Sequence, residues 1–134
     1  MTLNSYLSTV TLNVNELNDP IKRRRVLDWI KKQDPPICYL QETHFRHKDT
    51  YSLKIKGWRT IYHTNGPQKK AGVAILISDK LKFIPKTVVR DEKGHYIILK
   101  GSIQQEDLTI MNIYAPNVGA SKSINQLITK EILR

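Results

Sequence analysis

Hydrophobic and polar residues alternate or cluster along the chain in a way that predicts a series of short strands. Residues 7–14, LSTVTLNV, alternate in polarity and are rich in β-branched side chains, which is typical of a strand. Residues 37–41, ICYLQ, form a nearly continuous apolar run, which is typical of a strand buried on both faces. Further strand-like segments follow in series, separated by turn-like links: WRTIYH, AGVAILIS, LKFIPKTVV, HYIILKGSI and DLTIMNIYA.

Two other segments have the spacing of helices. Asp19 is a suitable N-cap and Pro20 a common first helical residue, so a helix is expected to run through IKRRRVLDWIKKQ. The prolines that follow end it, because proline lacks the amide donor and disfavours helix in the residue before it. Its many basic residues are interpreted as a solvated face rather than a DNA-reading surface. The second predicted helix is SKSINQLITKEILR, with Ser123 as its cap.

The order of these elements indicates the fold class. A strand, a helix and a second strand with short links form a βαβ unit, which favours parallel pairing through a right-handed crossover. The later strands are expected to extend this sheet as an antiparallel run. The pattern alone therefore predicts one α/β domain over residues 1–134, with a mixed sheet and flanking helices.

Composition narrows the class of protein. The 134 residues suit a single domain, and a hydrophobic content of 40% is enough for a packed core, which argues against a disordered chain. No segment approaches the roughly 18 consecutive apolar residues of a membrane span, and the start MTLNSYLSTV lacks the features of a signal peptide. The single cysteine, Cys38, lies in an apolar run and is interpreted as a buried, reduced thiol of an intracellular protein.

The charge of the chain points toward polyanionic partners. Lys and Arg number 22 against 12 Asp and Glu, which gives a formal net charge of +10. Such a field attracts nucleic acid first and an anionic membrane surface second. A basic protein without such a partner is the alternative. A free-standing RNA-binding module also fits the charge, although the aromatic signature of RNA-recognition sheets is absent.

Polar side chains stand where three of the predicted strands end, which is where ligands gather in an open α/β sheet. Asn13 ends the first strand, Glu42 ends the second, and Tyr114 with Asn117 ends the last. A lone carboxylate suits Mg²⁺, which keeps most of its waters and takes few protein oxygens. The amides and the phenol can donate to phosphate oxygens, so the group has the composition of part of a phosphodiester-cleaving site. Each residue also has an ordinary explanation in turn formation, solvation or packing.

Two further features are less informative. His44 and His47 are three residues apart, but no third histidine or nearby cysteine completes a zinc site. The loop GPQKKAG carries Lys69 and Lys70 between two glycines and lacks the Gly-Lys-Ser/Thr ending of a phosphate-binding loop. It is interpreted either as a basic loop beside DNA or as a plain hairpin link.

Several motifs, taken together and in order, resemble one family. They are TLNVNELN (11–18), QETH (41–44), KIKGWR (54–59), KKAGVAILIS (69–78), GHYIILKGSI (94–103) and LTIMNIYAPN (108–117). The set resembles the endonuclease domain of long interspersed element retrotransposons, a branch of the exonuclease III-like endonuclease/exonuclease/phosphatase superfamily. The resemblance covers nearly the whole chain, from about residue 7 to the final predicted helix.

The resemblance implies a four-layer sandwich of two packed sheets flanked by helices. It also implies cleavage of double-stranded DNA that depends on Mg²⁺, with Mn²⁺ as an alternative. Carried over by position, Glu42 and Asn13 are the expected metal-binding residues and, with Tyr114, the expected catalytic residues. Asn117 is expected to contact the DNA backbone, together with the two lysines of the basic loop. The expected location is inside the cell, in the nucleus, with no membrane contact and no small-molecule cofactor.

The sequence departs from the family's pattern in its second half. The family carries a Gly-Asp-Phe-Asn segment and, near its end, Ser-Asp-His, and neither occurs here; Ser78-Asp79-Lys80 lies far too early. Glu16 stands where a glycine is common in this branch, which places a negative charge near the phosphate loop. The chain is therefore expected to be the N-terminal half of the domain, inactive by itself, with one sheet face uncovered and a complementing C-terminal half as partner. The alternative is a non-catalytic, charge-driven nucleic-acid-binding fragment of a decayed element.

Overall fold

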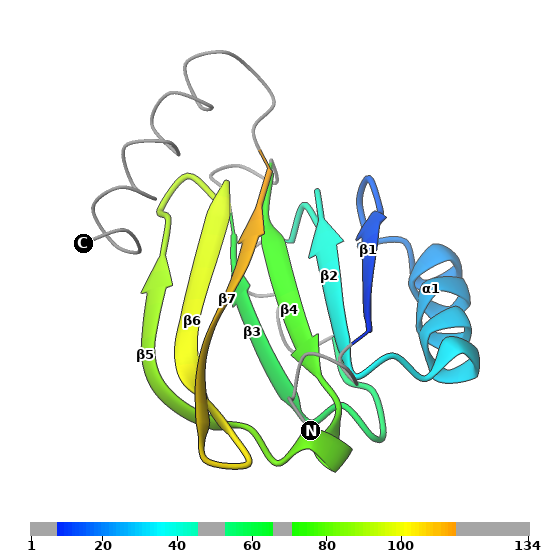
Figure 1. Cartoon of the computed structure of the whole chain (residues 1–134). Coiled ribbons are helices and arrows are strands. Elements are labelled where there is room, and N and C mark those ends of the chain that lie inside the picture. Colours follow the sequence, from blue (N-terminus) through cyan, green and yellow to red (C-terminus); the bar gives the residue numbers. More distant parts are fainter. Residues whose placement is uncertain (1–7, 46–52, 66–70, 115–134) are drawn as a thin grey trace.

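The computed structural model describes residues 8–45, 53–65 and 71–114, whose strands form two sheets that pack face to face (Figure 1). The four-stranded sheet has the order β1-β2-β4-β3 and contains β1 (Thr9–Asn13), β2 (Ile37–Gln41), β3 (Thr60–Thr64) and β4 (Val73–Ile77). The three-stranded sheet has the order β5-β6-β7 and contains β5 (Ile84–Arg90), β6 (Tyr96–Ile103) and β7 (Glu106–Ile113). The helix α1 spans Pro20–Gln33, and a short 3-10 helix, η4, spans Asp79–Leu81. Every predicted strand and the first predicted helix are confirmed, whereas the second predicted helix lies outside the described residues.

The ends of α1 follow the predicted capping chemistry. Asp19 is the N-cap, and its Oδ1 accepts a hydrogen bond from the Ile21 amide at 3.1 Å, while Pro20 occupies the first helical position. At the other end Asp34 takes a left-handed conformation, with φ 51°, and its amide donates to the Ile30 carbonyl at 2.8 Å. Local sequence therefore sets both ends of this helix.

The strand pairing agrees with the βαβ prediction but divides the remaining strands differently. β1 and β2 pair in parallel, and β4 lies between β2 and β3 with antiparallel pairing on both sides. β5, β6 and β7 form a separate antiparallel sheet instead of extending the first one. The predicted mixed sheet is confirmed in β1-β2-β4-β3, whereas the expectation that all later strands extend it is wrong for β5, β6 and β7; the two packed sheets implied by the family resemblance are present. Alternation along a strand shows that one face is buried, but not against which sheet.

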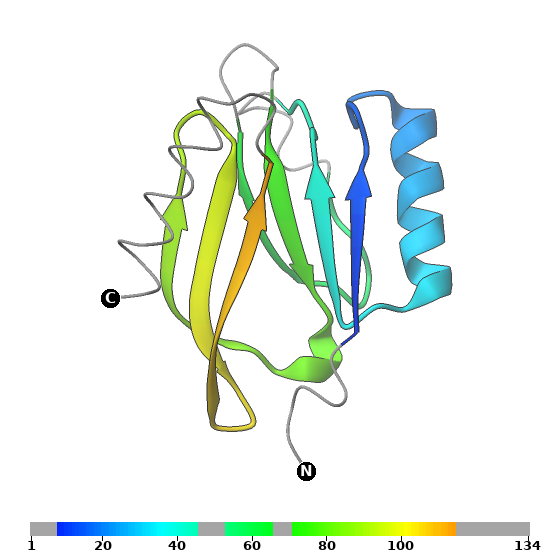
Figure 2. The same ribbon diagram turned by 45° about the horizontal axis from the view of Figure 1, so that its top comes forward.

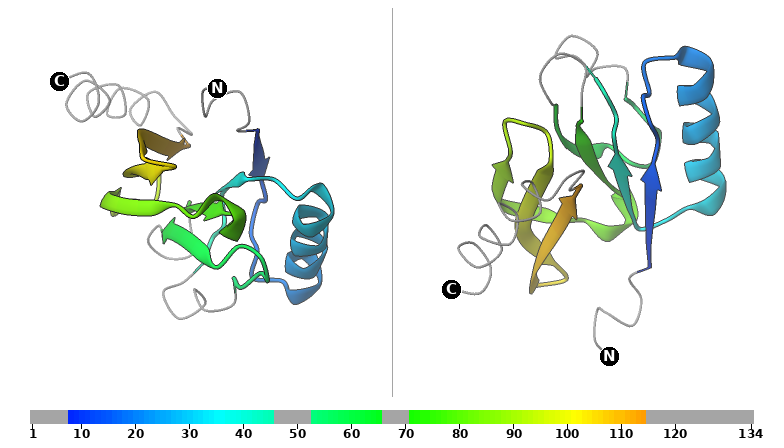
Figure 3. Two further views of the ribbon diagram at one scale, coloured as in Figure 1. Left: turned by 60° about the horizontal axis from the view of Figure 1, so that its bottom comes forward. Right: turned by 90° about the horizontal axis from the view of Figure 1, so that it is seen from above.

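Two apolar cores lie on the two faces of the four-stranded sheet, and β4 is buried throughout because it belongs to both. Figure 3 shows α1 and the three-stranded sheet on different sides of it. The outer core lies under α1 and the segment after residue 52, and includes Leu17, Ile30, Cys38, Leu40, Phe45, Trp58 and Leu76. The inter-sheet core lies between the sheets and is formed by Ile37, Val73, Ile75, Ile77, Ile97, Leu99 and Ile110.

The expectation of an uncovered apolar sheet face is wrong. The strands of this chain supply both sheets, so the inner faces of the two sheets bury each other. The part of the inner face that stays exposed belongs to β1 and is polar: Thr9, Thr11 and Asn13 are exposed and share a face with Ile37 and Tyr39 of β2. Within the described ranges, no helix has the length and apolar character needed to cross a membrane.

Candidate active site

The carboxyl ends of β1, β2 and β7 lie at one end of the sandwich (Figure 2). We call this end the rim; it comprises residues 13–18, 41–45, 71–72, 94–95 and 114. Asn13 is the last residue of β1, Glu42 directly follows β2, and Tyr114 directly follows β7. Asn13 is paired with Gln41, the residue before Glu42, in the parallel ladder. The structure therefore brings these three predicted site residues to one edge, whereas Asn117, Lys69 and Lys70 lie outside the described residues.

Backbone hydrogen bonds hold the loops after β1 and β2 together. The Glu16 amide donates to the Glu42 carbonyl at 2.7 Å, and the Leu17 amide donates to the Thr43 carbonyl at 3.0 Å. Leu17 is fully buried in the outer core, so the loop is anchored by packing as well as by hydrogen bonds. These contacts tie the loop that follows Asn13 to the segment that begins at Glu42.

A second set of backbone hydrogen bonds at the rim connects the four-stranded sheet with the three-stranded sheet. The Thr43 amide donates to the Gly72 carbonyl at 3.2 Å, and the Gly72 amide donates to the Gly94 carbonyl at 3.0 Å. The Tyr114 amide donates to the His95 carbonyl at 2.7 Å, next to Gly94. The rim is thus one hydrogen-bonded layer built from both sheets.

Two of the basic residues of α1 also support the rim. Lys22 Nζ donates to the Asn15 carbonyl, and Arg23 donates to the Leu17 carbonyl at 3.1 Å. Arg24 and Arg25, which follow them, are exposed. The basic face of α1 is therefore partly structural and partly exposed to solvent.

Several rim residues have a left-handed backbone, which L-residues rarely adopt. Glu42 has φ 57°, and it shares this conformation with Asn15, Glu16, His44 and Ala71. The conformation costs about 1–2 kcal/mol for a residue with a Cβ, and it persists where the surrounding structure imposes it. Residues held in this way are concentrated at functional sites, so the strain at Glu42 favours a functional role for its carboxylate.

The side chains of Glu42 and Tyr114 interact directly. A side-chain hydrogen bond to Glu42, followed by desolvation and by the charge of that carboxylate, raises the pKa of the Tyr114 phenol above its ordinary value of 10.0. Tyr114 is therefore a protonated hydrogen-bond donor at neutral pH. Among the described residues, Glu42 forms no ion pair with a basic side chain. A carboxylate without an internal cation is suited to an external one.

The donor set at the rim fits a hard divalent cation. Glu42 supplies a carboxylate and Asn13 an amide oxygen, which already accepts a hydrogen bond from the Asn15 amide at 3.2 Å. Mg²⁺ takes one or two such protein oxygens and keeps its remaining waters. No group of three or more His, Cys, Asp or Glu residues converges in the described part of the chain, so nothing there has the composition of a zinc site. The residues present thus fit part of a magnesium site.

Two polar residues that the sequence analysis did not single out lie at the base of the rim. Asn112, on β7, is 2% exposed, and Gln41 is the last residue of β2. Their side chains are hydrogen-bonded to each other at 3.2 Å across the gap between the sheets. The one available sequence signal is the position of Asn112 in DLTIMNI, where the alternation of the strand requires an inward-facing apolar residue.

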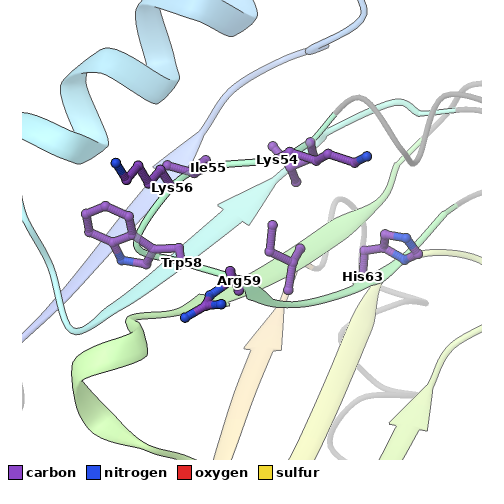
Figure 4. Close-up of a pocket in the computed structure, with 8 residues that line it drawn as sticks. Lys54, Ile55, Lys56, Trp58, Arg59 and His63 are labelled. Atoms are coloured by element: carbon purple, nitrogen blue, oxygen red, sulfur yellow. The ribbon is translucent and has the colours of Figure 1, made fainter.

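Two further features lie apart from the rim. A cavity of about 530 Å³ is lined by residues 53–63, including Lys54, Trp58 and Arg59, and no predicted site residue lines it (Figure 4). Cys38 is fully buried in the outer core, and burial raises the pKa of its thiol to about 12. The predicted burial of Cys38 is confirmed, and this thiol is unsuited to nucleophilic chemistry.

The sequence pattern of the Endonuclease/Exonuclease/phosphatase family matches residues 10–128. The chain belongs to this family. A curated relative, the Transposon TX1 uncharacterized 149 kDa protein of Xenopus laevis, is 24% identical over 117 residues, which cover 87% of this chain and 9% of that protein. The predicted membership in the superfamily is thereby confirmed.

Solved structures of family members have the same fold. The APE2 catalytic domain of Xenopus laevis matches with a TM-score of 0.64 at 17% identity, covering 88% of this chain and 48% of that one. The 3′ phosphatase NExo (D146N) from Neisseria, bound to a product DNA hairpin, matches with a TM-score of 0.66 at 18% identity, covering 93% and 52%. Truncated TDP2 of Caenorhabditis elegans matches with a TM-score of 0.63 at 19% identity, covering 92% and 57%. This member of the family therefore spans about half the length of these structures.

Proposed function

We propose that this chain carries the metal-binding part of a nuclease site that hydrolyses DNA phosphodiesters, of the exonuclease III-like type found in retrotransposon endonucleases. The observation that carries the proposal is the contact of the Glu42 carboxylate with the Tyr114 phenol at the rim, with Asn13 one strand away. Membership in the family and the similarity to a transposon protein support the same reaction class.

Each rim residue has a role that follows from its chemistry. Glu42 and Asn13 hold Mg²⁺, or Mn²⁺ in its place, because both present hard oxygen donors. When bound, the cation stabilises negative charge on the phosphoryl group under attack. Tyr114 has one O–H, which donates to Glu42 in the free chain and would donate to a phosphate oxygen once Glu42 holds the cation. Asn117 and the lysines at 69 and 70 contact the DNA backbone.

We further propose that a polypeptide of these 134 residues is inactive by itself. The Gly-Asp-Phe-Asn and Ser-Asp-His motifs, which orient the attacking water and supply the catalytic histidine, do not occur in the sequence. Removing members of a catalytic unit lowers the rate by orders of magnitude. Activity therefore requires a complementing C-terminal half that carries these motifs.

The described strands offer one side of the sandwich where such a half could bind. β1 and β7 each have a sheet neighbour on one side only among the described residues. β7 contacts β2 and β4 whereas β6 contacts β3 and β4, so β7 lies on the β1 side of the sandwich. Both sheets are thus open on the same side, beside the polar inner face of β1. Added strands could pair with both edges and complete the rim.

The partner and the location follow from the proposed reaction. The partner is double-stranded DNA, to which the charge of +10 attracts the chain. DNA is also the ligand named for the structurally similar NExo protein. The place of action is the nucleus, where chromosomal DNA is available to a retrotransposon endonuclease.

The proposal is tested by restoring the absent motifs. A fusion of this chain to the C-terminal half of a related endonuclease should nick supercoiled plasmid in Mg²⁺, and Glu42→Ala should abolish nicking. Asp79→Asn, which removes a carboxylate at the opposite end of the sandwich, is the matched control and should retain activity. Nicking that survives Glu42→Ala would exclude the assigned role. Glu42-dependent nicking by the isolated chain would show that the second half is dispensable.

A second candidate function is non-catalytic binding of nucleic acid, as expected for a fragment of a decayed element. The excess of 22 basic over 12 acidic residues favours it. It predicts sequence-independent binding of duplex DNA that weakens steeply between low and physiological salt, because each neutralised phosphate releases condensed counterions. Titrations of labelled duplexes at several salt concentrations would measure the slope, and affinity that is independent of salt would exclude this function.

A further inference from the structure

Asn112 is a polar residue in a position that packing alone would assign to an apolar one. It lies on the inner face of β7, two residues after Ile110, and both side chains are turned toward the four-stranded sheet. Burying an amide without hydrogen-bond partners costs free energy. The partners of Asn112 therefore indicate which parts of the fold it joins. Its Nδ2 group donates to the Leu40 carbonyl at 2.9 Å and to the Ala74 carbonyl at 2.8 Å. Both bonds donated by the Asn112 side-chain amide are thus accepted by backbone carbonyls of the four-stranded sheet.

Gln41 completes this arrangement. Its Nε2 donates to Asn112 Oδ1 at 3.2 Å and to the Ile113 carbonyl at 3.3 Å. Gln41 is the residue before Glu42, and Ile113 is the residue before Tyr114. The chain positions directly next to the two interacting rim residues are therefore joined by hydrogen bonds between one sheet and the other.

Apolar packing between the sheets cannot provide this alignment. The inter-sheet core consists of Ile, Val and Leu side chains, whose burial is favourable in many relative positions of the two sheets because the hydrophobic effect has no direction. Facing sheets lie about 10 Å apart, so no backbone hydrogen bond links β2 directly to β7 within the core. A fully hydrogen-bonded polar network, in contrast, is satisfied at one relative position only.

We propose that Gln41 and Asn112 are positioning residues that fix β7 relative to β2 and thereby hold Tyr114 against Glu42. The effect of these two residues on activity rests on the proposed function, because Glu42 and Tyr114 are the pair proposed to hold the cation and the phosphate. The hydrogen bonds by which Gln41 and Asn112 join the two sheets are independent of that function.

The test uses two variants that remove the hydrogen bonds by replacing each amide with an apolar side chain of similar shape. Gln41→Met deletes both bonds from Nε2, and Asn112→Leu deletes the three bonds made by the Asn112 amide. Ile110→Ala is the matched control, because Ile110 lies on the same strand and face, is 3% exposed and takes no part in the network. Thermal unfolding of all three variants measures the general loss of stability.

Two readouts separate positioning from stability. In NMR spectra of the isotope-labelled chain, the nuclear Overhauser effect between the Glu42 and Tyr114 side chains should disappear in Gln41→Met and Asn112→Leu and persist in Ile110→Ala. Affinity for Mn²⁺, from the signal of the free ion in electron paramagnetic resonance, should fall about ten-fold or more in the first two variants, as for other residues that orient a metal ligand. The control should stay within about two-fold.

The outcomes distinguish the two proposals. If wild type binds no Mn²⁺, or Glu42→Gln binds it equally well, the proposed function fails while the Overhauser effect still decides the positioning role. If the Overhauser effect persists in both network variants, or if Ile110→Ala abolishes it as well, the positioning role is overturned.

Discussion

Acidic side chains have different partners at the rim and at the opposite end of the sandwich. At the opposite end, three acidic side chains are paired internally: Asp79 with Arg59 at 3.1 Å, Asp34 with Lys80 at 2.8 Å, and Asp107 with Lys86 at 2.7 Å. At the rim, Glu42 contacts a phenol instead of a cation. The first arrangement places a cation against each of these carboxylates, whereas the second leaves a carboxylate available to a ligand. The comparison suggests that stability and function are divided between the two ends.

The largest effect is expected from two glycines, one at each end, that share a φ of 98°. A Cβ on Gly72 at the rim would lie 2.4 Å from Thr43 Oγ1, whereas a Cβ on Gly57 would meet nothing within 4 Å. Gly72→Ala should lower the free energy of unfolding by roughly 2–5 kcal/mol, through strain and overpacking together, and Gly57→Ala by about 1–2 kcal/mol through strain alone. Urea unfolding measures both. Adding Thr43→Ala should recover part of the loss at Gly72, and equal losses at the two sites would contradict the tight packing of the rim.

The next effect concerns the left-handed residues Glu16 at the rim and Gln105 in the turn between β6 and β7, with φ values of 79° and 67°. Changing either residue to Gly should raise the free energy of unfolding by about 1 kcal/mol, because glycine adopts this conformation without strain. Only Glu16→Gly should also strengthen binding of duplex DNA at low salt, since it removes a negative charge from the rim. Calorimetry and a DNA titration compare the two variants, and a gain in affinity in Gln105→Gly would contradict the local role of Glu16.

A smaller effect is expected on the ionisation of Tyr114. Glu42→Gln should lower the pKa of this phenol toward its ordinary value of 10.0, because the contact with the carboxylate is the main cause of the upward shift. Because the pKa of Tyr114 is higher in the folded chain than in the unfolded chain, folding favours the protonated phenol. The resulting contribution to stability is lost as the pH rises through the folded-state pKa. Ultraviolet difference titration, with Tyr114→Phe subtracted, isolates the signal. Asp79→Asn is the control and should leave the Tyr114 pKa unchanged.

The smallest effect is expected at the opposite end. Hydrogen bonds from Arg59, first from its backbone amide at 2.9 Å, hold the pKa of the Asp79 carboxyl below its ordinary value of 3.8. A lowered folded-state pKa contributes stability above the unfolded value, and this contribution is lost as the pH falls through the folded value. Asp79→Asn should therefore lower the Tm slightly at neutral pH and not at all in strong acid, because this pair is exposed and screened. A difference that grows in acid would contradict the assigned cause.

Much of the fold follows from short stretches of sequence. Asp19 and Pro20 predict the start of α1, and the structure confirms it, because capping depends on residues a few positions apart. The placement of Asn13, Glu42 and Tyr114 at strand ends also follows from sequence, once β1 and β2 are recognised as parallel. Both inferences rest on periodicity and on local backbone chemistry, which a linear pattern records.

Other parts of the molecule depend on contacts between residues far apart in the chain. The division of seven strands into two sheets is one such feature, since a strand with one buried face fits either sheet. The hydrogen bonds of Asn112 to Leu40 and Ala74 are another, because they cross between sheets and join residues 72 and 38 positions apart. No local pattern encodes these partners, although an amide in an apolar strand indicates that some partner exists.

The sequence by itself determined the individual strands, the first helix, the basic charge and the residue types available at the strand ends. Tertiary structure alone decided that the strands form two sheets, that the apolar inner faces cover each other, and that Glu42 meets Tyr114 in a strained conformation. The physical reason is that secondary structure and charge arise from neighbours along the chain. The alignment of one sheet on another arises from a few directional hydrogen bonds between distant residues, which only the folded chain brings together.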